Sequence, residues 1–267
     1  MAKAVAATMT KMKWILLVLV MLLAAVLSYL GWIKIRSAGF ESEYPLAIKW
    51  EGLYKDKNFR DIGDSINQCY GRQVMRTGLI FRSNGWFSGW DCNEVGNPAT
   101  IFSLNFDPKE KEMFYCWDSH EERPNIGKTF NTTIKLKGLE SLETWNNAEM
   151  RSAACQFLRE IFISIQQDKA TLIHCSAGRD RTGVYSALLA AVTAEYSNML
   201  DQNMLYAIEC DYRKTRSLKP ENYGRMERFL KDITRGGSVG QFLRSYCEIS
   251  EDATRKTGRM LAASREK

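Results

Sequence analysis

The stretch ATLIHCSAGRDRTG, residues 170–183, decides the fold of this 267-residue chain. Residues 170–175 form the short apolar run that is typical of a buried strand, and residues 182–194 have the spacing of a helix. The segment between them is a glycine-containing turn. A strand that leads through such a turn into a helix can aim several backbone N–H groups, and the positive end of the helix, at one anion. The stretch therefore predicts an α/β fold with an anion-binding loop.

Cys175 stands where the predicted strand enters this loop. A thiol at a helix N-terminus beside guanidinium groups has a lowered pKa, so its nucleophilic thiolate is populated near neutral pH. Arg181, six residues later, can hold two oxygens of one phosphate with its planar donors. The residues predicted to bind phosphate are Ser176, Ala177, Gly178, Arg179 and Thr182.

Three further features of the loop support a catalytic interpretation. We expect the hydroxyl of Thr182 to bind the Cys175 sulfur, and we expect Gly178 and Gly183 to allow backbone approaches that a side chain would block. We expect His174 and Gly183 to support the phosphate-binding loop. A bare C-x5-R match is common by chance, and its alternative is a structural cysteine with solvated arginines. Here the match has His before it, Arg-Thr-Gly at its end, and a strand and a helix on the correct sides, which favours function.

The stretch HCSAGRDRTG, residues 174–183, resembles the signature loop of the protein tyrosine phosphatase superfamily. The resemblance extends from about residue 50 to residue 249. It is similar to the bacterial and fungal tyrosine or lipid phosphatases whose loops read HC-x-x-G-[KR]-D-R-T-G. The other segments that carry it are NFRDIG (residues 58–63), VMRTGLIFRS (74–83), CDYRKTR (210–216) and GSVGQFL (237–243).

The resemblance implies a central, mostly parallel sheet flanked by helices, and a two-step reaction through a cysteinyl-phosphate. It implies no metal and no organic cofactor. Arg60 and Arg82 lie in the matched segments, and we expect them to support the loop or to contact the substrate.

Asp180 is the predicted general acid, because the resemblance places an acid and base beside the loop arginine and because the loop rim is where a leaving oxygen emerges. Its alternative role is an ion pair with Arg60 or Arg82. Between the strand predicted to end near residue 137 and the helix predicted to start near residue 147, the only carboxylates are Glu140 and Glu143. The upstream alternatives are Asp107 and Asp118.

Three functions remain open from the sequence. The first is a protein phosphatase of the tyrosine or dual-specificity kind. The second is a phosphatase of lipid or inositol phosphates, which the extra cation Arg179 and a predicted membrane segment favour. The third is an inactive phosphate-binding module, against which the intact Cys175, Asp180 and Arg181 argue. The net charge of +6 suits phosphorylated partners or acidic headgroups, or is a solvated basic surface; no Lys/Arg block is dense enough for nucleic acid.

Residues 14–33, WILLVLVMLLAAVLSYLGWI, contain no charge. Twenty such residues at a rise of about 1.5 Å match a hydrocarbon core of about 30 Å. A buried core helix would be shorter and polar on one face. A cleaved signal peptide would have a shorter apolar region and a small-residue cleavage site. We therefore expect an uncleaved, single-pass signal anchor.

Lysines 3, 11 and 13 precede this segment and only Lys34 and Arg36 follow it closely, which favours a cytoplasmic N-terminus and a catalytic domain in a periplasm or lumen. Six cysteines besides Cys175 would permit disulfides in such an oxidising compartment, or they are buried thiols. No two of the seven have C-x-x-C spacing, so a zinc ribbon is excluded.

The predicted organisation has three parts: an anchor (residues 1–36), a catalytic domain (37–251) and a polar tail (252–267) that frays. The remaining predicted strands are residues 99–106 and 131–136, and the remaining predicted helices are residues 149–165, 203–216, 221–234 and 238–247.

Overall fold

The structure of the chain is a computed structural model, which describes residues 14, 18–28, 57–85, 90–104, 114–118, 121–126, 134–216 and 218–263. The chain divides into two compact units, Met1–Glu43 and Tyr44–Lys267. In the first unit, Trp14 and residues 18–28 are helical and exposed. Within the described segments, no helix is both long enough and apolar enough to cross a bilayer. Part of the predicted span at residues 14–33 lies outside these segments.

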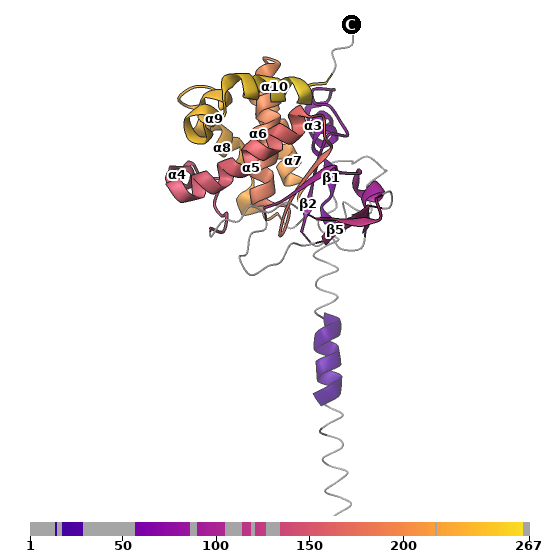
Figure 1. The fold of residues 1–267 in the computed structure, drawn as a ribbon. Helices are drawn as coiled ribbons and strands as arrows, with labels where there is room; N and C mark the ends of the chain where they lie inside the picture. Colours follow the sequence, from indigo (N-terminus) through magenta and orange to yellow (C-terminus); the bar gives the residue numbers. More distant parts are fainter. Residues whose placement is uncertain are drawn as a thin grey trace, which may run out of the picture. The chain divides into compact units, whose positions relative to one another are not determined.

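The second unit contains the predicted anion-binding loop and is an α/β structure (Figure 1). Its elements in chain order are β1 (Arg60–Asp61), α3 (Ile62–Tyr70), β2 (Ile80–Asn84), β3 (Trp90–Asp91), η2 (Cys92–Val95), β4 (Thr100–Ser103), β5 (Phe114–Asp118), β6 (Arg123–Ile126), α4 (Leu142–Asn146), α5 (Ala148–Gln166), β7 (Thr171–Cys175), α6 (Asp180–Tyr196), α7 (Gln202–Arg213), η3 (Pro220–Asn222), α8 (Arg225–Thr234), α9 (Val239–Cys247) and α10 (Glu251–Leu261).

The main sheet has the strand order β1-β2-β7-β4. The strands β2, β7 and β4 are parallel, and only the edge strand β1 is antiparallel to its neighbour. This arrangement confirms the predicted mostly parallel sheet flanked by helices. A second, three-stranded sheet has the order β3-β5-β6. Since β7 is central, the loop that follows it emerges between two parallel neighbours.

The two faces of the main sheet carry different cores. Ile173 and its partner Phe102 belong to the large core shared with the helices. One residue earlier on each strand, Leu172 and Ile101 are buried with Phe81 in a smaller core that includes η2 and part of β5. This separation follows from the alternation of side chains along a strand. The central strand is therefore buried on both faces, which suits its continuous apolar sequence.

Six of the seven cysteines are paired, and Cys175 is the free one. The disulfides are Cys69–Cys210, Cys92–Cys116 and Cys155–Cys247, with Cα–Cα distances of 6.0, 5.1 and 5.0 Å. These distances lie in the usual range for a disulfide. The bridges join α3 to α7, η2 to β5, and α5 to α9. Of the two alternatives that the sequence left open, the structure has disulfides rather than buried thiols.

The helices predicted on either side of the loop are confirmed. The helix predicted at residues 149–165 is α5, and its cap Asn147 accepts a hydrogen bond from the Met150 amide at 3.0 Å. The helix predicted at residues 182–194 is α6, which begins two residues earlier, at Asp180. Ser238 is the N-cap of α9, and its hydroxyl oxygen accepts a hydrogen bond from the Gln241 amide at 3.0 Å. Serine is a preferred N-cap residue for this reason.

Two other predictions need correction. Residues 134–136, the described part of the strand predicted at residues 131–136, are not in a strand. Leu136 is instead buried in the large core. Its burial explains the alternation of apolar and polar residues, although residues 134–136 pair with no described strand. The helix predicted at residues 221–234 starts only at Arg225, because the left-handed Gly224 separates it from the 3-10 turn at Pro220. The last predicted turn of α7, beyond Arg213, is also missing.

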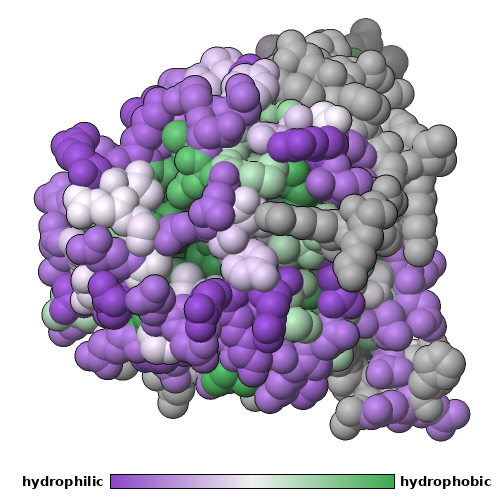
Figure 2. Space-filling view, turned by 90° about the horizontal axis from the view of Figure 1, so that it is seen from above, coloured by the Kyte–Doolittle hydropathy of each residue, from purple (hydrophilic) through white to green (hydrophobic). Residues whose placement is uncertain are grey.

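The polar C-terminal stretch, predicted to fray from residue 252, instead forms α10. Its buried face consists mainly of small residues, Thr254, Thr257 and Gly258, with Leu261. A Cβ atom at Gly258 would lie 2.7 Å from the Cβ of Tyr196, so the glycine allows α10 to pack closely on α6. Figure 2 looks down on the side where α9 and α10 lie in Figure 1, and shows a mostly hydrophilic surface.

Candidate active site

The predicted loop connects β7 to α6, so Cys175 is the last strand residue and Asp180 the first helical one. Cys175 is 2% exposed. Gly178 has a φ of +63°, and a Cβ atom there would lie 2.4 Å from the carbonyl oxygen of Ser83 on β2. The predicted need for glycine at this position is therefore confirmed, because both its conformation and its surroundings exclude a side chain.

Gly183, about one turn into α6, also allows a close approach by a neighbouring element. A Cβ atom at Gly183 would lie 2.8 Å from the ring of Tyr212 on α7. The absence of a side chain lets the Tyr212 ring of α7 approach α6. The sequence predicted a close approach at Gly183 but not its partner. This approach brings the Tyr212 side chain to the beginning of α6, where Asp180 lies.

The carbonyl groups of the loop are held by two buried side chains from other strands and turns. Nη2 of Arg82 donates to the carbonyl oxygens of Gly178 (2.9 Å) and Arg179 (3.4 Å). Nδ2 of Asn58 donates to the carbonyl oxygen of Gly178 at 3.1 Å and to that of Ala177 at 3.5 Å. Since the N–H and C=O of one peptide point in opposite directions, fixing these carbonyls away from the anion site leaves the following amides free to face it.

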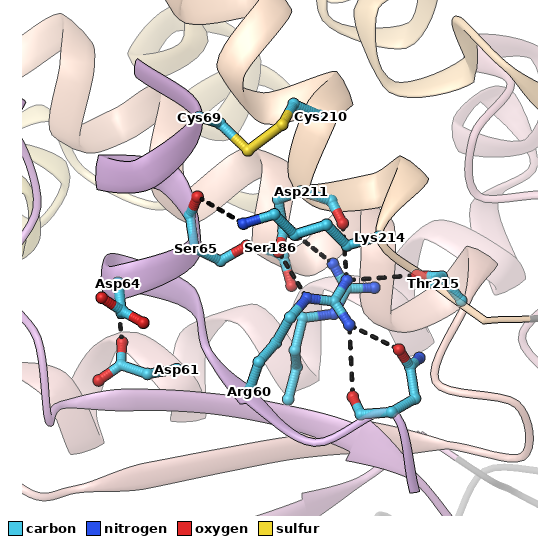
Figure 3. A network of polar contacts seen from close by, with 12 residues as sticks. Arg60, Asp61, Asp64, Ser65, Cys69, Ser186, Cys210, Asp211, Lys214 and Thr215 are labelled. Carbon is cyan, nitrogen blue, oxygen red and sulfur yellow. Dashed lines mark hydrogen bonds and ion pairs between the residues drawn. A yellow bond between two sulfur atoms is a disulfide. The ribbon is translucent and has the colours of Figure 1, made fainter. Parts of the chain in front are cut away.

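Asp211 pairs with both of the arginines that the sequence analysis selected, Arg60 and Arg82. Figure 3 shows Asp211 beside Arg60. The Oδ1 atom of Asp211 accepts from Nε of Arg60 at 2.7 Å and from Oγ of Ser65 at 2.7 Å, and its Oδ2 accepts from Nη1 of Arg82. Burial acts to raise the pKa of Asp211, but Arg60 and Arg82 outweigh it and hold the pKa well below its usual range. Asp211 is therefore ionised at neutral pH.

Arg60 and Arg82 are interior residues, 2% and 0% exposed. Burial, together with Arg60, lowers the pKa of Arg82 to about 10, so Arg82 remains a cation at neutral pH. Arg60 also donates to Oδ1 of Asn58 at 2.7 Å, which orients the amide that supports the loop. Of the two roles expected for these arginines, the geometry matches support of the loop.

Asp180 is bound by three groups at the start of α6. Its Oδ1 accepts from the Tyr212 hydroxyl at 2.7 Å and lies 3.6 Å from Nη1 of Arg225, and its Oδ2 accepts from Nε of Arg179 at 3.0 Å. The alternative of an ion pair with Arg60 or Arg82 is wrong, because those two arginines pair with Asp211. The carboxylate is about one-quarter exposed, so it lies on the rim of the loop.

Glu140 is the second carboxylate at this rim. Its Oε1 lies 3.1 Å from Nη1 of Arg225, the same nitrogen that approaches Asp180. Glu140 is one of the two carboxylates that the sequence analysis found ahead of α5, and the structure places it close to the loop. The rim cluster contains two guanidiniums, of Arg179 and Arg225, and two carboxylates, so its formal charge is zero.

Arg181 and Thr182 are the remaining residues predicted to bind phosphate, and only Arg181 makes a side-chain hydrogen bond within the described part of the chain. Nη1 of Arg181 donates to the carbonyl oxygen of Leu104 at 2.7 Å, which anchors the guanidinium at the end of β4. Thr182 is buried, and its Oγ1 makes no hydrogen bond to any described residue. The predicted contact with the sulfur is therefore not formed in this structure, although the hydroxyl remains available for it.

His174 precedes Cys175, the predicted nucleophile, and is buried. Burial, helped by the nearby positive charge of Arg181, lowers the pKa of His174 to about 3. The imidazole is therefore neutral at physiological pH. Its carbonyl oxygen accepts from the Leu104 amide at 2.8 Å, which extends the pairing of β7 with β4 up to the loop.

Of the other predicted acids, Asp118 belongs to the three-stranded sheet and not to the main sheet that carries the loop. Asp118 ends β5 in the three-stranded sheet, where its Oδ1 accepts from the Glu121 amide at 3.2 Å. Asp107 lies outside the described residues. Among the residues that are described, no group of three or more His, Cys, Asp or Glu side chains could hold a metal ion.

Sequence reasoning missed four residues of the site: Asn58, Asp211, Tyr212 and Arg225. The first three lie in segments whose resemblance was noted, NFRDIG and CDYRKTR, but no role was assigned to them. An Asp and a Tyr side by side on an otherwise amphipathic helix give little signal alone. Their importance emerges only when α7 is seen to pack beneath the loop.

Comparison with known proteins adds one match. The sequence model of the tyrosine phosphatase family matches residues 131–263. The match includes the loop, Asp211 and Tyr212, and it starts after the segments that contribute Asn58, Arg60 and Arg82. No curated protein matches the chain significantly.

Proposed function

Since the chain belongs to the tyrosine phosphatase family, we propose that it releases phosphate from monoesters through a cysteinyl-phosphate intermediate on Cys175. The observation that carries the proposal is the support of the loop: buried donors on Arg82 and Asn58 bind its carbonyl groups, so its amides can converge on an anion beside the sulfur. A phosphate bound there lies at the N-terminus of the 17-residue helix α6, where negative charge is stabilised.

In the first step, the thiolate of Cys175 attacks phosphorus and the bond from phosphorus to the ester oxygen breaks. The proton that this oxygen needs comes from Asp180 at the rim. Arg181 holds two equatorial oxygens in the transition state, for which its planar donors are suited. Its contact with the Leu104 carbonyl fixes the direction from which the guanidinium approaches.

In the second step, Asp180, now a carboxylate, takes a proton from a water molecule that attacks the phosphoryl group. The sulfur leaves as a thiolate, which Thr182 can stabilise through its buried hydroxyl. The contacts of Asp180 with Tyr212, Arg179 and Arg225 hold its carboxylate group in place at the rim, where it can take this proton.

For the substrate, we propose phosphorylated protein side chains, tyrosine or dual-specificity. The rim cluster supports this choice because the Glu140 carboxylate pairs with Arg225 and reduces the positive charge available to a second phosphate. The alternative is a lipid or inositol phosphate. It is supported by the position of Arg179 at the rim and by the membrane segment predicted at residues 14–33.

The test is phosphate release by the full-length protein from a panel of phosphotyrosine, phosphoserine and phosphothreonine peptides and phosphoinositide vesicles. We expect the highest kcat/KM on phosphotyrosine peptides. Higher kcat/KM on the vesicles would select the lipid alternative. No release from any member by wild-type protein would contradict the proposed activity itself.

We also propose that the protein is a single-pass membrane protein whose catalytic unit faces an oxidising compartment, a periplasm or a lumen. The support is the uncharged run at residues 14–33, the excess of lysine before it, and the three disulfides. Disulfides persist in such compartments and are rare in a reducing cytosol. Cys175 has no partner for a disulfide within the chain, so it can remain a nucleophile there.

A further inference from the structure

Asp211 is the point at which the supports of the loop meet. One carboxylate oxygen binds Arg60 and Ser65, and the other binds Arg82, whose second terminal nitrogen holds the carbonyl groups of Gly178 and Arg179. The backbone carbonyl of Asp211 also accepts from Nη2 of Arg60 at 2.7 Å. Figure 3 shows Arg60 and Asp211 at the centre of this network, with the disulfide Cys69–Cys210 immediately beside it.

The charge of the network is as important as its geometry. Two buried guanidiniums and one buried carboxylate give a net charge of +1 beneath the loop. Arg82 pairs in register with Ile173, two residues before Cys175, so its side chain and that of Cys175 leave the sheet on the same side. Among the described residues, the other charged or titratable side chains around the loop and this network include His174, Arg179, Asp180, Arg181, Tyr212, Lys214, Arg225 and Glu140.

We propose that Asp211 is a positioning residue that sets two properties of the active site at once: the direction of the loop carbonyls and the positive charge that the Cys175 sulfur experiences. The proposal rests on the proposed function, because it concerns the same nucleophile. The side chain of Asp211 binds Arg60, Ser65 and Arg82, so it acts on the loop through Arg82 and, by way of Arg60, through Asn58.

The two properties respond differently when the carboxylate is replaced. In Asp211→Asn the side chain keeps its size but loses its charge, so the network changes from +1 to +2. More positive charge favours the thiolate, and Cys175 should then react at lower pH. At the same time Arg82 loses a charged anchor, so the loop carbonyls are held less firmly and phosphate release should slow. A residue of purely structural importance would slow release without changing the pH at which Cys175 reacts.

Arg82→Gln provides the opposite charge change. It lowers the net charge of the network from +1 to 0, so Cys175 should react only at higher pH. Asn58→Ala removes a support of the Gly178 carbonyl without changing any charge, so it should slow phosphate release and leave the reaction pH of Cys175 in place. Together these variants separate the electrostatic effect from the geometric one.

Glu209→Gln is the matched control. Glu209 lies on the same helix as Asp211 and is similarly buried, but its carboxylate accepts from the amides of Gly224 and Met226 at the start of α8. The same chemical change there removes a cap and a charge away from the loop. We expect reduced stability and an unchanged reaction pH for Cys175.

The experiment measures the rate of alkylation of Cys175 by iodoacetamide against pH, on unreduced full-length protein. Cys175 is the one cysteine outside a disulfide, so the rate reports it alone. We expect the midpoint to move down by about one pH unit in Asp211→Asn and up by about one unit in Arg82→Gln. Phosphate release should fall by about 10²-fold in Asp211→Asn, with most of the loss in kcat.

Folding of each variant is checked by its urea unfolding transition. Midpoints that stay at the wild-type value in both folded charge variants, or that move in the same direction, would overturn the proposal. If Asp211→Asn does not fold, the comparison of Arg82→Gln with Asn58→Ala tests the proposal. Equal midpoints of Cys175 alkylation in these two variants would overturn it. Opposite midpoint shifts in a protein that releases no phosphate would instead refute the proposed function and leave the charge relation intact.

Discussion

The hydroxyl of Tyr212 donates a hydrogen bond of 2.7 Å to Oδ1 of Asp180. Burial, reinforced by the neighbouring Asp180, raises the pKa of Tyr212 above its usual range, so the phenol stays protonated and acts as a donor. With Arg179 on the other carboxylate oxygen, Asp180 is held in one orientation at the rim of the loop. This arrangement makes the role of Asp180 testable with two substitutions.

Asp180→Asn should slow phosphate release from an alkyl phosphate by about 10²–10⁴-fold, because its alkoxide leaving group needs a proton. The loss on an activated aryl phosphate, whose leaving group hardly needs one, should be much smaller. Steady-state kinetics on both substrates measure the contrast. Equal losses on both would mean that Asp180 only holds the loop, and Glu140, Asp118 and Asp107 would then be the next acids to test.

A second substitution, Tyr212→Phe, removes one hydrogen bond that orients Asp180. We expect kcat on the alkyl phosphate to fall, but by less than in Asp180→Asn. Tyr206→Phe, on the exposed side of the same helix, is its control and should leave kcat unchanged.

The buried His174 should make the protein less stable in acid. Its pKa is about 3 in the folded chain and about 6.5 when exposed, so protonation favours the unfolded state. The stabilisation is complete above pH 6.5 and is lost as the pH falls toward 3, by up to about 1.4 kcal/mol for each pH unit. Urea unfolding of wild type and His174→Gln from pH 7 to pH 4 should show this difference in slope.

Asp61 must be considered in the same pH range. Burial raises the pKa of Asp61 to about 6 although the Gly78 and Asp64 amides donate to it. Its folded pKa lies above its unfolded value, so its contribution is lost as the pH rises through 6, opposite to that of His174. The difference between wild type and His174→Gln cancels the Asp61 contribution. A difference that does not vary with pH would contradict a neutral, buried His174.

The disulfide Cys69–Cys210 should contribute more to stability than Cys92–Cys116. The two bridges span sequence separations of 141 and 24 residues, for which loop-closure entropy predicts about 5 and about 3.5 kcal/mol. Urea unfolding of the Cys69→Ala/Cys210→Ala and Cys92→Ala/Cys116→Ala double variants compares them. Thiol titration of unfolded, unreduced wild-type protein should detect one thiol, that of Cys175; seven thiols would contradict the pairing.

The predicted anchor can be tested by fractionation. Full-length protein should sediment with membranes and resist carbonate extraction, whereas a chain that starts at residue 37 should stay in the supernatant. The catalytic unit should be digested by protease only from the periplasmic or lumenal side. A mature protein whose N-terminus lies beyond Gly31 would show that residues 14–33 belong to a cleaved signal.

The sequence was sufficient for the loop and its immediate surroundings, since the apolar run of β7 and the helical spacing of α5 and α6 are local patterns. It was insufficient for α10, because Thr254, Thr257 and Gly258 form a buried face without large apolar side chains. At residues 134–136 the sequence predicted a strand that the structure does not contain. Their alternating pattern arises because Leu136 is buried in the core, without a neighbouring strand.

The supports of the loop could not be predicted because they are assembled from distant segments. Asn58, Arg82 and Asp211 meet only after β1, β2 and α7 have packed together. Each is an ordinary polar residue in its own segment. The partners of Asp180 were misassigned for the same reason, since Arg225 belongs to α8, 45 positions further along the chain.

The covalent intermediate tests the central claim most directly. Wild-type protein is mixed with an aryl phosphate, quenched in acid during turnover and digested without reduction, and the peptide that contains Cys175 is weighed by mass spectrometry. We expect one phosphoryl group on Cys175 in wild type and none in Cys175→Ser, which should have lost turnover while still binding a phosphate analogue. Phosphate release by Cys175→Ser at a rate near that of wild type, or a phosphoryl group on a residue other than Cys175, would contradict the account.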